Sequence, residues 1–261
     1  MAIETIAIVG LIVFWTAFLI FAICFGKESI ATYEHKRKSL NAKRISVSKQ
    51  LLAATTASLF VLGVSYIALI LDQGFFMREP GIVIWWPRFI AYSLSYAALS
   101  YSISTYVWTY VKDKVAATLA GFAFWVVAGI MGSFTGADDY HWIYFGVAFI
   151  PLLSAFFIWC WRKSRTNDEV VNGLILVILL LNVGFGVTWG LSPAGADVID
   201  LETAFWIYFI LEILTFILYP WYLIFTYVSK KYATHTSKTT KVDLRQHQQQ
   251  QSYYQQQKNH Y

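Results

Sequence analysis

The sequence predicts an all-α protein, a bundle of seven transmembrane helices, and three observations lead to this fold class. Of the 261 residues, 57% are hydrophobic and 18% aromatic, while only 13% are charged, which is not the composition of an ordinary soluble domain. Seven apolar segments recur along the chain, each close to the roughly 20 residues that cross a bilayer as a helix. The loops between them alternate between basic and acidic. We therefore expect a multi-pass protein of the plasma or cell membrane.

The seven predicted spans belong to one membrane domain, residues 1–230. The first span follows Glu4 instead of a basic segment, and no small-residue cleavage site comes after it. It is therefore expected to remain as a helix and not to be removed as a signal peptide. Residues 231–261 form a cytosolic tail that is first basic and then rich in Gln, and we expect it to be disordered. The predicted spans, with boundaries good to about three residues, are 5–25, 51–71, 88–111, 115–134, 142–161, 170–190 and 203–227.

The distribution of charge predicts the orientation, because Lys and Arg mark cytosolic loops. They gather in the first, third and fifth loops and in the tail, whereas the other loops carry acids such as Asp72, Asp138 and Asp200. The N-terminus is therefore predicted outside and the C-terminus in the cytosol. The same bias accounts for the formal net charge of +5, so the lipid bilayer is the expected partner and a nucleic acid is not. We expect the basic first loop and tail to contact anionic lipid. Two interpretations of the Gln-rich tail remain: it mediates self-association into a homo-oligomer, or it is only a solvated tail.

The first three spans differ in polarity. The first is apolar throughout and is interpreted as structural, whereas the second carries small hydroxyl residues, Thr55, Thr56, Ser58 and Ser65, that suit close helix contacts. The segment 72–87 is longer than a tight turn, which predicts a hairpin or an interfacial segment with its tryptophans at headgroup level. The third span is the richest in Ser, Thr and Tyr. Lipid does not solvate such groups, so this helix is expected at the centre of the bundle.

The next three spans contain few polar groups. The fourth is rich in Gly and Ala and is expected to pack closely, and the fifth contains Pro151, which should bend it. In the sixth span, Asn182, Phe185 and Trp189 recur at i, i+3 and i+7 and so share one helical face. An amide in mid-membrane needs a hydrogen-bond partner, so Asn182 is expected to face the interior of the bundle.

The seventh span carries an ionisable acid, Glu212, with Tyr208 and Thr215 on the same helical face. A carboxyl group inside lipid is costly, so it should point into the bundle and have a partner there. Apart from Glu212, Arg88 is the only Lys, Arg, His, Asp or Glu within the predicted spans. The sequence therefore predicts a buried ion pair of Arg88 and Glu212. A protonated Glu212 bonded to a tyrosine such as Tyr92 or Tyr208 remains the alternative.

Two of these stretches resemble the microbial rhodopsin family. The third helix of that family reads Arg-aromatic-x-Asp-Trp-x-x-Thr, and here the stretch from Arg88 to Ser95, RFIAYSLS, stands in that place. Its seventh helix follows an external Glu-Thr with a Leu-Asp-x-x-x-Lys core, and here Glu-Thr at 202–203 precedes LEILTF at 211–216. Phe185 and Trp189 stand where its sixth helix has aromatic residues of the retinal pocket. The resemblance covers the whole bundle without the tail, and it implies a seven-helix bundle of the microbial rhodopsin type.

The residues that make the family photoactive are replaced in this chain. The family binds retinal as a Schiff base on the Lys four residues after the helix-seven acid, where Phe216 has no amine. The family has its counter-ion Asp three residues after the Arg, where this chain has Ala91. It has its proton donor about fourteen residues after the Arg, where this chain has Ser102. The chain thus resembles the lysine-less, opsin-related members. The resemblance implies loss of covalent retinal binding and of light-driven proton pumping.

We expect a non-catalytic function, that of a sensor or a ligand-binding or partner-binding membrane protein. No cofactor is predicted, but a non-covalent apolar ligand fits the family's pocket between helices three, five, six and seven, which a Phe keeps apolar or fills. The alternative is a passive or weak ion pathway along the hydroxyl-rich third helix. A zinc enzyme is not expected, because none of the five His residues lies in mid-span, so neither a metal nor enzyme activity is predicted. The pocket candidates are Tyr92, Ser95, Tyr96, Asn182, Phe185, Trp189, Tyr208 and Thr215.

Overall fold

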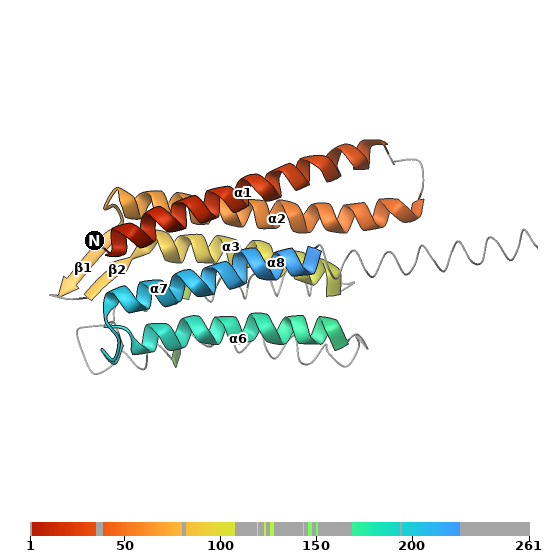
Figure 1. Cartoon of the computed structure of the whole chain (residues 1–261). Coiled ribbons are helices and arrows are strands. Elements are labelled where there is room, and N and C mark those ends of the chain that lie inside the picture. Colours follow the sequence, from red (N-terminus) through yellow and green to blue (C-terminus); the bar gives the residue numbers. More distant parts are fainter. Residues whose placement is uncertain are drawn as a thin grey trace, which may run out of the picture. The chain divides into compact units, whose positions relative to one another are not determined.

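The computed structural model describes residues 2–34, 39–79, 82–107, 169–193 and 195–224, with a few single residues between 119 and 150. Apart from those single residues, the predicted fourth and fifth spans, 115–134 and 142–161, lie outside the described part of the chain, and so does the tail. Residues 1–220 form one compact unit, which is described by itself. Its elements (Figure 1) are α1 (Ala2–Glu34), α2 (Ser39–Ile70), β1 (Phe75–Glu79), β2 (Ile82–Trp85), α3 (Trp86–Val107), α6 (Glu169–Leu191), α7 (Leu201–Glu212) and the π-helix η1 (Ile213–Leu218), followed by α8 (Tyr219–Trp221).

Three helical stretches of the described chain are long and apolar enough to cross a membrane: Ile3–Ile30, Lys49–Ile70 and Leu201–Ile224. They contain the predicted span 5–25, all but the last residue of 51–71, and most of 203–227. A shorter apolar stretch, Leu176–Leu191, covers most of the predicted sixth span and ends one residue beyond it. These segments are helical, as the sequence predicts.

Helices α1 and α2 are longer than their predicted spans, with 33 and 32 residues. Neither 26–34 nor 39–50 contains a proline, so nothing in the chain stops the helices where the apolar run ends. The ammonium group of Lys49 lies 5.8 Å from the centroid of the Phe25 ring, so the two helices still contact each other at this level. The span boundaries therefore mark the apolar segment and not the helix ends.

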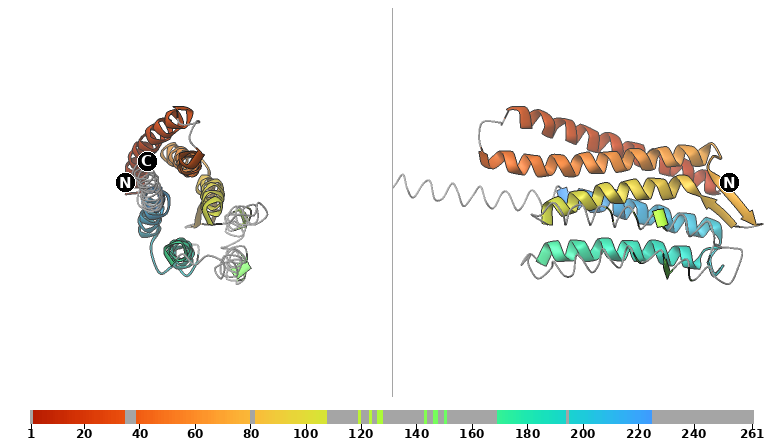
Figure 2. Two further views of the ribbon diagram at one scale, coloured as in Figure 1. Left: turned by 90° about the vertical axis from the view of Figure 1, so that its right-hand side faces the viewer. Right: turned by 180° about the vertical axis from the view of Figure 1, so that it is seen from behind.

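Neighbouring helices pack along their lengths. α1 packs on α2, α2 on α3 and α6 on α7, and α7 also contacts α1 (Figures 1 and 2). α1 buries Phe14 and Phe21 toward these neighbours. Its other face leaves large apolar side chains exposed, and so does that of α6, where Leu180 is 60% exposed. Apolar side chains on both the packed and the open face are what a helix with one side against lipid requires.

Several described serine and threonine hydroxyls of α2 and α3 donate to backbone carbonyls. Thr55 donates to the carbonyl of Leu51 at 2.8 Å, as do other Ser and Thr residues to the turn before them. Ser58 also donates across to the carbonyl of Ser95 at 3.3 Å, and Ser95 donates back to the carbonyl of Ser58 at 3.3 Å. This reciprocal pair brings the two backbones close, which is the role predicted for the small residues of the second span.

The turns at one end of the bundle are defined by local interactions. The hairpin predicted between the second and third spans is present, with Phe75 opposite Trp85 in an antiparallel register. Gly74 before it has φ +81, and a Cβ there would lie 2.5 Å from the ring of Pro87, so this position requires glycine. At the start of α7, Asp200 is the N-cap and accepts from the amide of Thr203 at 3.1 Å. Hydrogen bonds from Thr203 hold the pKa of Asp200 below its usual value.

Candidate functional site

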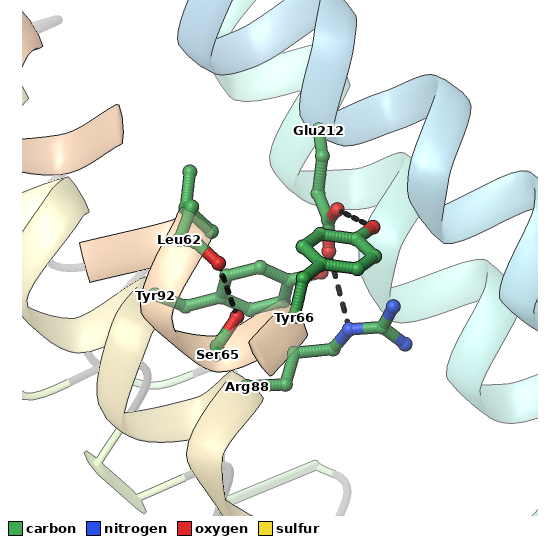
Figure 3. Close-up of polar contacts among 6 residues, drawn as sticks. All are labelled: Leu62, Ser65, Tyr66, Arg88, Tyr92 and Glu212. Carbon is green, nitrogen blue, oxygen red and sulfur yellow. Dashed lines mark hydrogen bonds and ion pairs between the residues drawn. The ribbon is translucent and has the colours of Figure 1, made fainter. Parts of the chain in front are cut away.

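The centre of the bundle contains a buried acid with three donors around it. Glu212 is the last residue of α7 and is 1% exposed. Tyr66 of α2 donates to its Oε2, Tyr92 of α3 donates to its Oε1, and Arg88 Nε lies 3.1 Å from the same Oε1 (Figure 3). Three helices thus meet at one carboxyl group. We call these four residues the Glu212 cluster.

Arg88 is held by aromatic rings as well as by the acid. It is 6% exposed, and its guanidinium carbon lies 4.6 Å from the ring centroids of Trp85 and Phe205 and 5.0 Å from that of Tyr208. Such cation–π contacts stabilise a cation that has left water. Arg88 Nε has ion-pair distance to Glu212 without hydrogen-bond alignment, and Nη2 has no hydrogen-bond partner among the described residues. The three aromatic rings are therefore major contacts of the Arg88 guanidinium.

The donors around Glu212 fit an ionised carboxylate. Both carboxylate oxygens accept a phenol hydroxyl, and a cation is adjacent to one of them. A carboxylate can accept from all three groups, whereas a protonated acid would have to donate its own proton to one of the two phenol oxygens. The structure brings together Arg88 and Glu212, as the sequence suggests, with Tyr92 as one of the two hydroxyl partners considered. With both Arg88 and Glu212 ionised, the cluster contains one positive and one negative charge.

Tyr66 is the member of the cluster that sequence reasoning missed, and Tyr208 is not the second hydroxyl partner. The ring of Tyr208 lies instead beside Arg88 and stacks on Phe185 with centroids 6.1 Å apart. A signal for Tyr66 did exist, because it is the single tyrosine of the second predicted span. A lone phenol in an apolar helix needs a buried partner for its hydroxyl.

Phe216 is buried in an aromatic cluster. It is 1% exposed. Its ring stacks on Tyr92 at 6.1 Å and meets Tyr96 edge-on at 5.2 Å, while Tyr92 meets Phe185 edge-on at 5.1 Å. Ala91 on α3 is also buried. The two residues that the sequence resemblance sets against the retinal lysine and the counter-ion are therefore apolar and buried.

The other predicted site residues divide into two groups. Asn182 is buried and donates to the carbonyl of Ile178 at 2.7 Å, and its Oδ1 has no hydrogen-bond partner among the described residues. Thr215 is fully buried, and Trp189 is partly exposed. Ser95 does not contact Glu212 but pairs with α2. Ser102 lies on α3, but its side chain is outside what the structure describes.

The helical geometry changes at Glu212. A π-helix follows it, and the amide of Tyr219 bonds to the carbonyl of Leu214, five residues back. Wider π turns commonly occur at functional sites. Thr215 and Phe216 within it are buried, at 0% and 1% exposure. The segment therefore continues the buried face on which Glu212 lies.

No group of three or more His, Cys, Asp or Glu residues that could hold a metal occurs within the described part of the chain. The chemistry of the site is that of one ion pair, two phenol hydroxyls and aromatic rings. Such a set can bind and orient, but it contains no amine that could form a Schiff base.

Comparisons with known proteins identify the fold. No family model and no curated protein matches the sequence. Solved structures do match. Schizorhodopsin 4 matches with a TM-score of 0.67 and 19% sequence identity, over 85% of this chain and 98% of that one. The thermophilic rhodopsin from Rubrobacter xylanophilus matches with a TM-score of 0.70 and 12% identity, over 85% of this chain and 94% of that one, and bromide-bound halorhodopsin from Halobacterium salinarum with a TM-score of 0.71 and 17% identity, over 88% of this chain and 95% of that one. The chain therefore has the seven-helix fold of the microbial rhodopsins and is a multi-pass membrane protein, as predicted.

Proposed function

We propose that this chain is a rhodopsin-fold membrane protein that does not bind retinal covalently and does not pump protons. Phe216 carries the proposal. A Schiff base forms from a primary amine, and at this position the chain has a phenyl ring packed between Tyr92 and Tyr96. None of its lysines lies within a predicted span, so no other residue supplies the amine.

The charge balance of the Glu212 cluster supports the same proposal. A protonated Schiff base needs an anion beside it, and a buried cation without one is strongly unfavourable. Here the charge of Glu212 is already balanced by Arg88 at 3.1 Å, and Ala91 supplies no second acid. The charge of Glu212 therefore needs no further cation to balance it.

A site of this kind suits binding and not catalysis. The side chains that contact Phe216 are aromatic, and on α6 the Oδ1 of Asn182 is buried without a hydrogen-bond partner among the described residues. We propose a sensor or ligand-binding role in which an apolar molecule is held without a covalent bond, or a role in binding a partner protein. The similarity to rhodopsins and pumps supports the fold and not a particular activity. The absence of enzyme activity is therefore part of the proposal.

Contacts on the cytosolic side belong to the proposal as well. The predicted orientation places the first loop in the cytosol, where Lys27 is exposed and Lys49 lies beside Phe25. We propose that this basic loop and the basic part of the tail contact anionic lipid headgroups. Self-association through the Gln-rich tail is the remaining proposed interaction.

The alternative, an ion pathway, would depend on the hydroxyls of the third span. Of these, Ser93 donates to the carbonyl of Phe89 at 2.8 Å, and Ser95 donates to α2. A hydroxyl that already donates its proton in this way cannot also donate it to an anion. Arg88 lies among three aromatic rings in the same helix bundle. These contacts favour the binding role over the pathway.

Two measurements separate the binding role from the pathway. Liposomes with the reconstituted protein should show no flux of H⁺, Na⁺, K⁺ or Cl⁻ above empty liposomes, with a pore-forming peptide as the positive control. Native mass spectrometry of the protein in mild detergent should show a retained small molecule or a protein partner. Flux above the control, with nothing retained, would support the pathway and contradict the binding role.

A further inference from the structure

Helix α1 approaches the Glu212 cluster at one glycine. A Cβ at Gly10 would lie 2.2 Å from Cε1 of Tyr66, 2.5 Å from its Cδ1 and 2.6 Å from its Cζ. Ordinary contacts of a Cβ begin at 3.4 Å. Any side chain at position 10 therefore requires the Tyr66 ring to move by more than about 1 Å. Protein interiors are packed as closely as crystals, so such a movement also displaces the neighbours of the ring.

The Tyr66 ring has little room for such a movement. Phe14, one turn after Gly10 on the same helix, stacks on it with centroids 5.3 Å apart. Trp85 meets it edge-on at 6.0 Å and Phe209 at 6.4 Å. The ring is thus enclosed by α1, α7 and the end of β2, and its hydroxyl donates to Glu212. A shift of about 1 Å is enough to lose a hydrogen bond, because the donor–acceptor distance has a narrow range.

We propose that Gly10 is a positioning residue of the Glu212 cluster: the absence of a side chain there lets α1 hold the Tyr66 ring so that its hydroxyl reaches Glu212. Helix α1, which contributes no polar group to the cluster, is then its fourth structural element. This role is independent of the proposed function, because it concerns how the cluster is assembled and not what binds to it.

The same helix offers a matched control. Gly26 also lies on α1, and a Cβ added there would meet nothing within 4 Å, so Gly26→Ala adds a methyl group without a clash. Alanine is the better helix former, and Gly26→Ala should keep or raise Tm. Gly10→Ala should lower Tm although it makes the same chemical change in the same helix.

The decisive readout is the infrared carboxylate band of Glu212, assigned by its loss in Glu212→Gln. We expect Tyr66→Phe to shift this band, because it removes one donor. Gly10→Ala should shift it in the same direction and to a similar extent, Gly26→Ala should not, and Gly10→Ala should add no further shift in the Tyr66→Phe background. A wild-type band in Gly10→Ala, with Tyr66→Phe shifted, overturns the positioning role. An unshifted Tyr66→Phe overturns it too, since the hydroxyl would then not act on Glu212.

A second variant decides the case if Gly10→Ala does not accumulate as folded protein. Tyr66→Leu removes the ring with which the new methyl group collides. Gly10→Ala combined with Tyr66→Leu should then accumulate to the level of Tyr66→Leu alone. If the double variant remains as poorly folded as Gly10→Ala, the glycine is required by something other than Tyr66 and the proposal is wrong.

Discussion

Replacing Glu212 by Gln removes the negative charge at the centre of the bundle while nearly keeping the side-chain shape. Glu212 is 1% exposed and Arg88 6%, so the change leaves a buried cation without its anion. Breaking a buried pair in this way costs about 3–5 kcal/mol in the free energy of unfolding. Few single substitutions destabilise a protein by that much.

The surroundings of the two residues refine this magnitude. After Glu212→Gln, Arg88 keeps its contacts with three aromatic rings at 4.6–5.0 Å, each worth about 0.5–2 kcal/mol. After Arg88→Gln, Glu212 keeps the hydroxyls of Tyr66 and Tyr92, and hydrogen bonds to a charged group contribute about 1.5–3 kcal/mol each. Both single losses should therefore be near the lower end of the range. The double variant should lose less than their sum, by a coupling energy of about 1–3 kcal/mol.

The assay is thermal and denaturant unfolding of the purified variants in one mild detergent, followed by tryptophan fluorescence. Glu202→Gln is the matched control, because it changes an exposed acid in the first turn of the same helix and should alter stability by less than about 0.5 kcal/mol. Strict additivity of the Arg88 and Glu212 losses would refute the reasoning, since two residues that do not interact cannot show a coupling energy.

Three further predictions concern orientation, hydroxyl partners and helix capping. Cysteines introduced at positions 137 and 240 should be labelled from opposite sides, outside and cytosolic respectively; labelling from one side contradicts the seven-span topology. Tyr66→Phe should destabilise the protein by about 1.5–3 kcal/mol and more than Tyr208→Phe, whose ring is what contacts Arg88; equal losses would remove Tyr66 from the cluster. Asp200→Ala should lower Tm at neutral pH, and Asp200→Asn should not. Because its folded-state pKa is depressed, the stabilisation by Asp200 should be present at neutral pH and lost as the pH falls through that pKa.

The scarcity of charge in the spans made part of the site predictable. The predicted spans contain one acid and one Arg, so each has a single residue of opposite charge as a candidate partner. The structure places Arg88 Nε 3.1 Å from Glu212 Oε1. The family resemblance identified position 216, and Phe216 is indeed buried beside Tyr92. Both inferences use chemistry that a linear sequence displays directly: charge, and the lack of an amine.

Features that depend on neutral groups and on packing were not predictable in the same way. Tyr66 lies 146 residues before Glu212 in the chain, and a phenol carries no charge pattern that marks its partner. The clash that makes Gly10 necessary depends on the position of a ring from another helix. The π-helix after Glu212 is equally hidden, because the apolar residues of ILTFIL suit an α-helix as well as a π-helix.

The central claim is that position 216 cannot form a covalent bond with retinal. The most direct measurement is to add all-trans retinal to the purified protein in the dark, treat it with borohydride and record both the absorption spectrum and the intact mass. Phe216→Lys combined with Ala91→Asp supplies the missing amine and counter-ion and serves as the comparison. The account predicts no red-shifted band and no trapped retinyl mass in the unmodified protein, and both in the double variant. A borohydride-trapped retinyl adduct within the bundle of the unmodified protein would contradict it.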